Sequence, residues 1–253
     1  MSDALDFAHE LADIADEISM RYFRSTDMNV RSKTDGTPVT QADEGIERAL
    51  REVIAATYPL HGVFGEEEGD VSGSVDSRWI IDPIDGTKNF SWGIPVWGTL
   101  IALETSGRIV CGIVSAPALG ERYAAERGQG ATRNGMPITV SEVDDLAQAR
   151  LGFGSVHSFD NTGDQDRFRR LVTMTKHDRG IGDFYGHMLV ASGALDLMVE
   201  PQLSPWDLAP LLVIVEEAGG RLTDMAGIPH IYGGNVVTTN GRLHEAVLGV
   251  LGA

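Results

Sequence analysis

The residues best suited to chemistry lie in the run 79–87, which reads WIIDPIDGT. Its apolar start predicts a strand, and Asp82 and Asp85 follow around a proline that stiffens the turn. Mg²⁺ takes oxygen ligands, and one or two carboxylates plus substrate phosphate oxygens are enough to bind it. Both carboxylates and the Ile84 carbonyl could face one group of ions, so the run indicates metal-assisted phosphate chemistry.

The residues after Asp85 indicate where a phosphate would lie. Gly86 and Thr87 stand at the expected start of a helix, and the first N–H groups of a helix can bind an anion. Asp-Pro and Asp-Gly are also ordinary turn pairs, because Asp bonds to nearby backbone and Gly tolerates a positive φ. Taken alone, the run leaves open whether it forms a site or only a turn.

The net charge limits the partners of the chain. It has 253 residues, 42% of them hydrophobic, and a formal charge of −17. The composition predicts a globular protein, and the charge predicts a surface that repels nucleic acids and anionic membranes. The same charge repels a phosphate ester unless bound cations invert the local field. We therefore expect metal ions rather than a basic pocket, and no nucleic-acid or membrane partner.

Cysteine content and the N-terminus predict the compartment. Cys111 is the only cysteine and lies in an apolar run where a buried strand position is expected. One cysteine excludes an intrachain disulfide and a thiol-rich zinc site. The N-terminus lacks the pattern of a signal peptide, and no run of about 18 apolar residues predicts a membrane span. These features predict a cytoplasmic protein.

Three further acidic positions could complete a site, and each has a structural alternative. Glu66 follows the apolar pair 63–64, but the glutamate cluster 66–68 is also typical of a solvated loop. Asp207 stands at the start of an apolar helix, where Asp is also a good N-cap. Asp43 lies near the start of another helix, where a negative charge is favourable in itself.

Apolar periodicity predicts the elements that must position these residues. Spacings of three and four predict amphipathic helices, and short apolar runs between glycine-rich turns predict strands. We expect helices over residues 3–24, 42–57, 164–176, 184–195, 206–218 and 241–251. We expect strands over residues 62–65, 79–82, 97–104, 109–115, 121–125, 150–155, 221–223 and 235–238. A hairpin turn is expected at Ser106-Gly107, and a turn or hairpin tip in the polar segment 31–38.

The two halves of the chain differ in pattern. Strands predominate before about residue 145, and helices alternate with strands after it. We expect an α+β half over 1–145, with an antiparallel sheet and most of the metal ligands, and an α/β half over 146–253 that carries Asp207. No internal repeat and no long linker divides them.

Together these positions resemble one known pattern. The run 82–87, with Glu66 before it and Trp206-Asp207 far behind it, is similar to the inositol monophosphatase-like family of metal-dependent, lithium-sensitive phosphatases. The resemblance extends from about Asp43 to Gly220. It implies a layered α-β-α-β-α sandwich, of the α+β or α/β class, that forms a homodimer and hydrolyses a small phosphate ester.

The resemblance also implies roles for the matching positions. The implied metal ligands are Glu66, Asp82, Ile84 through its carbonyl, Asp85 and Asp207. They would hold two Mg²⁺ ions bridged by Asp82, with a third, weaker ion near Glu66, and Mn²⁺ can substitute. The implied catalytic residues are Asp43, Glu66 and Thr87, and Thr87 with Asp43 would orient and deprotonate the attacking water. The implied substrate contacts are Glu44, Ile84, Asp85, Gly86, Thr87, Asp183, Glu200 and Asp207.

One substrate contact bears on the leaving group. Inositol-preferring members carry a small residue after the glycine that matches Gly182, whereas this chain has Asp183. A carboxylate there suits a cationic leaving group, because an amine would gain a charge-assisted hydrogen bond. Its structural alternative is an N-cap for the helix that follows.

Further segments support the same conclusion about the substrate. Gly182–Phe184, Lys88–Phe90, Gly93–Trp97 and Ser115–Leu119 together resemble most the family's histidinol-phosphate phosphatases, which serve histidine biosynthesis. The resemblance implies hydrolysis of L-histidinol phosphate, with Asp183 and either Glu44 or Glu200 receiving the amine and imidazole. An inositol-1-phosphate phosphatase with broad sugar-phosphate tolerance is the nearest alternative. A regulatory or binding protein on the same scaffold is an alternative of another class.

Overall fold

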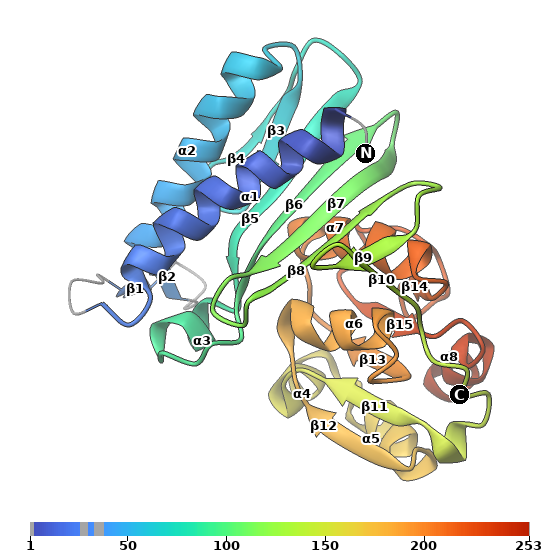
Figure 1. The fold of residues 1–253 in the computed structure, drawn as a ribbon. Helices are drawn as coiled ribbons and strands as arrows, with labels where there is room; N and C mark the ends of the chain where they lie inside the picture. Colours follow the sequence, from blue (N-terminus) through green and yellow to red (C-terminus); the bar gives the residue numbers. More distant parts are fainter. Residues whose placement is uncertain (1–2, 26–29, 33–37, 253) are drawn as a thin grey trace.

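The computed structural model describes residues 3–25, 30–32 and 38–252, and helices and sheets alternate through it in layers (Figure 1). The first layer is α1 (Asp3–Tyr22) and α2 (Gln41–Thr57), the middle layer α6 (Asp183–Ala191) and α7 (Pro205–Glu217), and the last α4 (Val156–Thr162), α5 (Gln165–Met174) and α8 (His244–Gly252). An eight-stranded and a five-stranded sheet lie between these layers. The predicted α-β-α-β-α sandwich is therefore confirmed.

The eight-stranded sheet carries the first half of the site. Its spatial order is β10 (Met136–Ile138), β9 (Ala131–Arg133), β8 (Glu121–Glu126), β7 (Arg108–Ala116), β6 (Gly98–Thr105), β5 (Ser77–Asp85), β3 (Gly62–Gly65) and β4 (Gly69–Val71). All its pairs are antiparallel except β3–β5, which confirms the antiparallel character expected of this half. Ser106 and Gly107, both with positive φ, form the predicted β6–β7 turn, which suits the twist of a hairpin.

Strand β5 is apolar on both faces because both faces are covered. Ile80 packs in the core that α6 and α7 form with the sheet, and Ile81 packs in the core under α1 and α2. Successive strand residues point to opposite faces, so Asp82 points to the α7 side with Ile80. Asp85 in a regular strand would point the other way. A register shift in the pairing with β6 between Asp82 and Asp85 is a β-bulge, which re-aims the end of the strand.

The five-stranded sheet carries the second half of the site. Its order is β12 (His177–Gly180), β11 (Arg150–Phe153), β13 (Leu197–Glu200), β15 (Val236–Thr239) and β14 (Arg221–Thr223). Helices α4, α5 and α8 pack on one face, around Leu151, Phe168 and Val247. Helix α6 contacts β11, β13 and β15 as well as α7, and so lies between the sheets. The strands of the two sheets lie on either side of residue 145, but the division there into two domains remains a prediction, since α7 joins the core of the first sheet.

The elements with strong apolar patterns form close to the predicted bounds, and several short ones went unpredicted. Residues 184–195 are expected to be helical throughout, but α6 ends at Ala191, and the terminal helix begins at His244 rather than at 241. The sequence gives no expectation of β4, β9, β10, β12, β13, α4, α3 (Thr87–Ser91) as a complete helix, or the 3₁₀ turn Leu146–Gln148. All of these except α4 have five residues or fewer, and periodicity is a weak signal over so short a run.

Two further expectations concern β7 and the segment 31–38. Cys111 is buried in β7, as predicted. Strands β1 (Val30–Ser32) and β2 (Pro38–Thr40) pair as a hairpin around the predicted tip, whose residues 33–37 lie outside the described residues.

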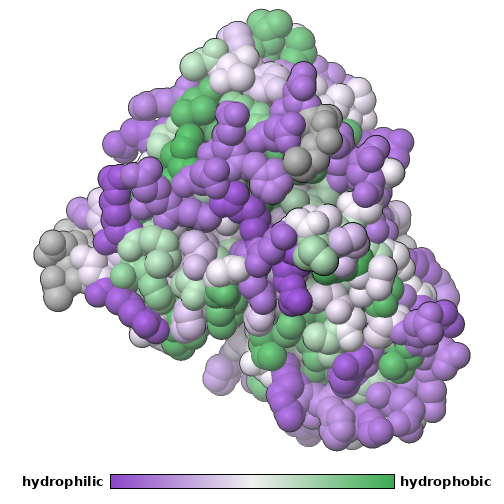
Figure 2. Space-filling model, in the orientation of Figure 1, coloured by the Kyte–Doolittle hydropathy of each residue, from purple (hydrophilic) through white to green (hydrophobic). Residues whose placement is uncertain are grey.

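The surface is mixed but rich in hydrophilic residues. In Figure 2 a hydrophilic band follows the outer side of α1, in keeping with the acidic composition of the chain. Among the described residues, no helix has the length and apolar content needed to cross a membrane.

Candidate active site

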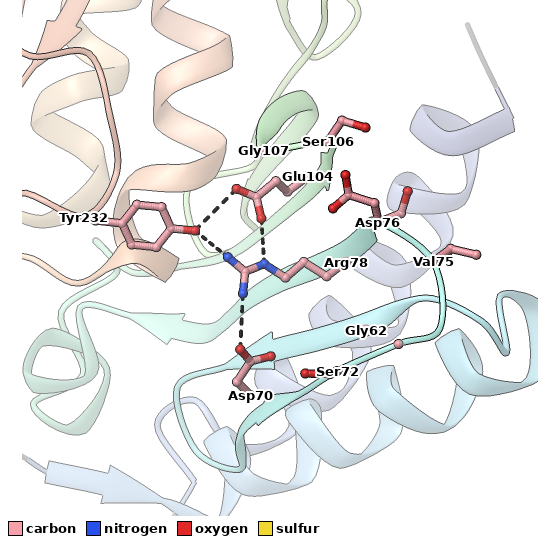
Figure 3. A pocket seen from close by; sticks show the side chains of 12 residues that line it. Gly62, Asp70, Ser72, Val75, Asp76, Arg78, Glu104, Ser106, Gly107 and Tyr232 are labelled. Carbon is pink, nitrogen blue, oxygen red and sulfur yellow. Dashed lines mark hydrogen bonds and ion pairs between the residues drawn. The ribbon is translucent and has the colours of Figure 1, made fainter.

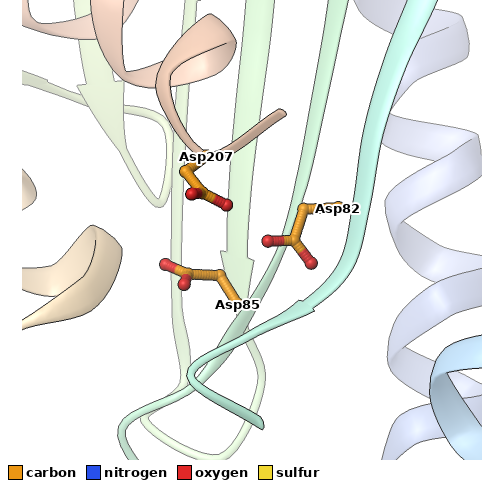
Figure 4. Close-up of side chains that lie close together, drawn as sticks. All are labelled: Asp82, Asp85 and Asp207. Carbon is orange, nitrogen blue, oxygen red and sulfur yellow. The ribbon is translucent and has the colours of Figure 1, made fainter. Parts of the chain in front are cut away.

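Three carboxylates from two distant parts of the chain converge where the end of β5 meets the start of α7 (Figure 4). Asp82 and Asp85 come from the end of β5 and Asp207 from the first turn of α7. One oxygen of each lies within 4.8 Å of one oxygen of each of the others. The structure thus brings together three of the five predicted metal-binding positions.

Local structure fixes each of these side chains differently. Asp207 Oδ2 accepts a hydrogen bond of 2.8 Å from the N–H of Ser204, which is the N-cap of α7. Asp207 is therefore not the N-cap, but it completes the capping box of the helix and also faces the cluster. Asp85 Oδ2 accepts a hydrogen bond of 2.6 Å from the N–H of Phe184 in α6. Asp82 Oδ1 is buried and has no hydrogen-bond partner in the described part of the chain. A buried oxygen of this kind is costly unless a ligand or ion satisfies it.

The electrostatics of the cluster favour a bound cation. Burial raises the pKa of Asp82 well above its usual value, and the charges of Glu66, Asp85 and Asp207 raise it further. Burial and the neighbouring Asp183 and Asp207 likewise raise the pKa of Asp85. The pKa of Asp207 is raised to about 7, chiefly by burial. Carboxylates this close cannot all ionise cheaply, and a dication with oxygen preference offsets their charge. The donor set therefore fits Mg²⁺ or a similar hard ion.

Glu66 lies beside this cluster without joining its closest group. It follows β3, and its N–H donates to the Ile81 carbonyl at 3.2 Å. Its charge raises the pKa of both Asp82 and Asp207. It is not among the carboxylates within 4.8 Å of one another. Glu66 therefore interacts electrostatically with the cluster, and its role as a metal ligand remains a prediction.

Asp43 and Thr87, the pair predicted to orient and deprotonate the attacking water, lie next to each other. Asp43 Oδ2 accepts hydrogen bonds from the Thr40 N–H at 2.9 Å and the Thr40 hydroxyl at 2.5 Å, in the capping box that starts α2. The Thr87 hydroxyl donates to the Ile84 carbonyl at 2.9 Å and lies 3.5 Å from Asp43 Oδ1. Burial raises the pKa of Asp43 to about 6. Asp43 can complete the capping box and contact Thr87 at the same time, because the capping box uses Oδ2 and the contact with Thr87 uses Oδ1.

Gly86 connects β5 to α3 in a conformation that favours glycine. Its φ is 82°, and a Cβ there would lie 3.1 Å from the Val96 carbonyl and 3.3 Å from Asp183 Oδ2. The absence of a side chain therefore lets this turn pass close to Val96 and Asp183. Because α3 has only five residues, an anion here would depend on individual N–H groups more than on a helix dipole.

Asp183 and Glu200 form a pair of carboxylates next to the cluster of Asp82, Asp85 and Asp207. Asp183 is the first residue of α6, with a φ of 57° that is unusual for a non-glycine residue, and Asn89 Nδ2 donates to it at 3.3 Å. Burial and the charge of Glu200 raise its pKa to about 6, against the opposite effect of Lys88. The N-cap of α6 is Gly182, so the prediction that Asp183 caps this helix is wrong.

Glu200 is held at the end of β13 by a buried histidine. His187 Nε2 lies 3.1 Å from Glu200 Oε2, and His187 Nδ1 lies 2.8 Å from the Thr238 hydroxyl. Burial raises the pKa of Glu200 to about 8 and lowers that of His187 to about 3. A neutral imidazole beside a protonated or hydrogen-bonded carboxyl satisfies both groups without a buried ion pair. These two contacts of His187 fix the orientation of the Glu200 carboxyl.

Glu44 lies apart from this pair. It is part-exposed on α2, and its Oε1 is 2.5 Å from Arg31 Nη2 in β1. The described contacts do not bring it to Asp183 or Glu200, so its part in substrate binding remains a prediction.

Sequence reasoning missed the residues that support the site from behind. Glu47 on α2 is fully buried and binds the turn that carries Glu66, and the Phe184 N–H binds Asp85. Glu47 resembles any charged helix residue in the sequence, and a backbone N–H leaves no sequence signal. The one available signal is spacing: Glu47 stands three residues before Leu50 and seven before Ile54, which places it on the apolar face of α2.

A separate pocket lies away from these carboxylates (Figure 3). It has a volume of about 420 Å³ and contains none of the predicted site residues. Arg78 crosses it, donating to Glu104 at 2.6 Å and Asp70 at 3.2 Å and bonding to the Tyr232 hydroxyl. Tyr232 comes from the second half of the chain, so the network fastens the two halves together.

The fold and the carboxylate site define a class, a phosphoric monoester hydrolase. The family model described as the inositol monophosphatase family matches residues 1–252, and the chain belongs to that family. It is 44% identical over 256 residues to a histidinol-phosphatase of Mycobacterium tuberculosis, covering 99% of this chain and 98% of that protein. It is 43% identical over 259 residues to a histidinol-phosphatase of Streptomyces coelicolor, covering 98% and 97%.

A solved structure shows the same architecture. The extragenic suppressor protein suhB from Bartonella henselae superposes with a TM-score of 0.92 at 30% sequence identity, covering 99% of this chain and 98% of that one. The family resemblance that the sequence predicts is thus confirmed.

Proposed function

We propose that this phosphatase hydrolyses L-histidinol phosphate to L-histidinol and inorganic phosphate, with Mg²⁺ as its cofactor. The observation that carries the proposal is the carboxylate pair of Asp183 and Glu200 directly beside the Asp85 end of the acidic cluster. The likeness to two histidinol-phosphatases, each over nearly its full length, supports the same substrate.

Metal ions would be held by the residues whose oxygens converge. Asp82, Asp85 and Asp207 supply the closest oxygens, and Glu66 and the Ile84 carbonyl lie at their edge. Bound Mg²⁺ would supply the positive charge that stabilises the phosphoryl oxygens and lowers the pKa of the attacking water. Two or three ions would suit this number of ligands, and Mn²⁺, which also prefers oxygen, would substitute.

The chain's own residues then handle the proton. Thr87 and Asp43 lie 3.5 Å apart, with the Thr87 hydroxyl free to turn between the Ile84 carbonyl and Asp43. The hydroxyl would orient the attacking water, and Asp43 would accept its proton. A base with a pKa raised to about 6 is suited to this task near neutral pH, since most of it is ionised and it still holds a proton well.

The carboxylate pair of Asp183 and Glu200 would bind the leaving group. Asp183 faces Gly86 at the phosphate end, and the adjacent Phe184 N–H fixes Asp85. One peptide therefore joins the recognition of the alcohol to the placement of a metal ligand. The primary amine of histidinol would form a charge-assisted hydrogen bond with Asp183, and Glu200, steadied by His187, would meet the imidazole.

The deciding experiment is a parallel measurement of kcat/KM for L-histidinol phosphate and inositol 1-phosphate at saturating Mg²⁺. We expect the histidinol ester to be preferred by at least about tenfold, as one charge-assisted hydrogen bond is worth more than 1.4 kcal/mol. Equal values would favour a broad sugar-phosphate phosphatase. No hydrolysis of any small ester would favour a binding protein on this scaffold. The homodimer, the cytoplasmic location and the absence of nucleic-acid partners remain predictions.

A further inference from the structure

The carboxylate of Glu47 is buried and turned toward the segment that carries Glu66. Glu47 lies on α2 with no exposed surface. Its Oε2 accepts a hydrogen bond of 2.7 Å from the Glu67 N–H, and its Oε1 accepts one of 3.0 Å from the Glu68 N–H. These are the two peptide groups that directly follow Glu66. One side chain from a helix thus binds a turn about 20 residues further along the chain.

Arg51 holds this carboxylate from its other side. Its Nε donates to Glu47 Oε1 at 2.9 Å, and Nη2 lies 2.8 Å from the same oxygen. Nη2 also donates to the Gly69 carbonyl at 2.5 Å. The Arg51 side chain is only 12% exposed, so solvent screens the pair weakly. Glu47 therefore binds the middle of the turn, at the N–H groups of Glu67 and Glu68, and Arg51 binds its end, at the Gly69 carbonyl.

The residue before Glu66 gives an independent sign of this close approach. A Cβ at Gly65 would lie 2.2 Å from Glu47 Oε1, a distance that real Cβ atoms do not show. The carboxylate therefore occupies the space that any other residue would need at position 65. Backbone on both sides of Glu66 is packed against one buried side chain.

We infer that Glu47 is a positioning residue, which holds Glu66 against the Asp82 cluster through the two N–H groups that follow it. The inference rests on the proposed metal-binding function of Glu66. Glu66 lies outside the closest group of carboxylates, so its reach to the ions depends on where the turn is held. Asp43 lies one helical turn before Glu47, on the same face of α2. The same helix thus sets the position of the proton acceptor and of the outlying ligand.

Mn²⁺ binding to the intact protein tests the inference, measured by electron paramagnetic resonance and calorimetry. In Glu47→Gln the side chain keeps its shape, but an amide can accept only at its oxygen, so one turn N–H or Arg51 loses its partner. We expect the weakest Mn²⁺ site to lose about 10- to 100-fold in affinity, the range seen for outer residues of metal sites. Added Mn²⁺ should restore kcat, whereas KM for the ester should change little.

Two variants bracket this result. Arg51→Lys keeps the positive charge but loses the planar set of guanidinium donors, so we expect a smaller loss of Mn²⁺ affinity than in Glu47→Gln. This variant tests the inference by itself if Glu47→Gln does not fold. Glu104→Gln is the matched control, because Glu104 is also a buried glutamate bonded to an arginine but lies in the separate pocket. Its Mn²⁺ affinity should equal that of the unaltered protein.

Glu66→Gln separates the inference from the function on which it rests. If Glu66→Gln weakens Mn²⁺ binding while Glu47→Gln and Arg51→Lys bind normally, Glu47 does not position Glu66 and the inference is overturned. If Glu66→Gln itself binds Mn²⁺ normally, the proposed ligand is wrong, and the inference fails with it for that separate reason. Parallel losses in Glu66→Gln and Glu47→Gln, with Glu104→Gln unchanged, support it.

Discussion

Asp82 and Asp85 lie three residues apart on β5, yet their carboxylates come within 4.8 Å of each other and of Asp207. A regular strand would send them to opposite faces of the sheet. The register shift against β6 between these two residues removes that conflict. Two further contacts hold the distorted end of the strand: the Thr99 hydroxyl donates to the Pro83 carbonyl at 2.7 Å, and the Phe184 N–H donates to Asp85 at 2.6 Å.

Asp82→Asn should reduce kcat by at least about 100-fold, more than the loss typical of residues behind a metal ligand. The same change should raise the melting temperature in EDTA, because it removes a buried charge from a repulsive cluster. Steady-state kinetics and calorimetry on one preparation measure both effects. Near-normal turnover at saturating Mg²⁺ would refute the role of Asp82 as a metal ligand.

Removal of metal ions should make stability fall as the pH rises. The pKa of Asp207 is raised to about 7 in the folded protein, and those of Asp82 and Asp85 are raised too. A carboxyl group with a raised pKa binds more protons folded than unfolded. Its contribution to the free energy of unfolding is fully present below the pKa of the unfolded chain, near 4. That contribution is lost as the pH rises through the pKa of the folded protein.

Melting temperatures across pH test this expectation. With EDTA, the cluster should lower the melting temperature progressively from about pH 4 to above pH 7. Mg²⁺ should therefore stabilise the protein more at pH 8 than at pH 5, and Asp82→Asn should show a smaller difference. An equal Mg²⁺ effect at both values would mean that these carboxylates are not linked to the ions.

Activity should fall in acid as Asp43 becomes protonated. Its pKa is raised to about 6 by burial, and bound cations would lower it, so the acid limb of kcat/KM should lie at or below about pH 6. Thr87→Ser should keep this limb and most of the rate, whereas Thr87→Val should lose the rate because no hydroxyl remains to orient water. A limb unchanged in Asp43→Asn would assign the ionisation to another group.

Asp183→Asn should act on the substrate rather than on the metal. We expect KM for L-histidinol phosphate to rise by about 10- to 100-fold, because a hydrogen bond to a charged group is worth about 1.5–3 kcal/mol. The KM for inositol 1-phosphate and the affinity for Mn²⁺ should change much less. An unchanged KM for the histidinol ester would show that the amine lies elsewhere.

The elements around the site were predictable where one physical signal dominated. The apolar stripes of α1 and α2 match their buried faces, and the continuous apolar runs of α7 and β5 match elements that are buried on all sides. Strand β13 was missed because its four residues continue the apolar pattern that follows α6. Strand β12 was missed because all its residues are polar or glycine and exposed.

The residue types of the candidate site could be predicted from the sequence, but the contacts that position those residues could not. Asp43 and Asp207 each fit two interpretations in the sequence. In the structure each is the third residue of a helix and uses one oxygen to accept from the N-cap backbone, Thr40 or Ser204, in a capping box. The bulge in β5 and the clamp of Glu47 on the turn depend on pairing with distant backbone. No local pattern reports such contacts.

The position of Asp207 has a consequence for the making of the enzyme. Its carboxylate comes from late in a chain of 253 residues, after the partners on β5 and α2 have already been synthesised. A polypeptide still emerging from the ribosome therefore lacks one of the three converging carboxylates until α7 has been made. Fragments that end before α7 would have only Asp82 and Asp85 of this cluster.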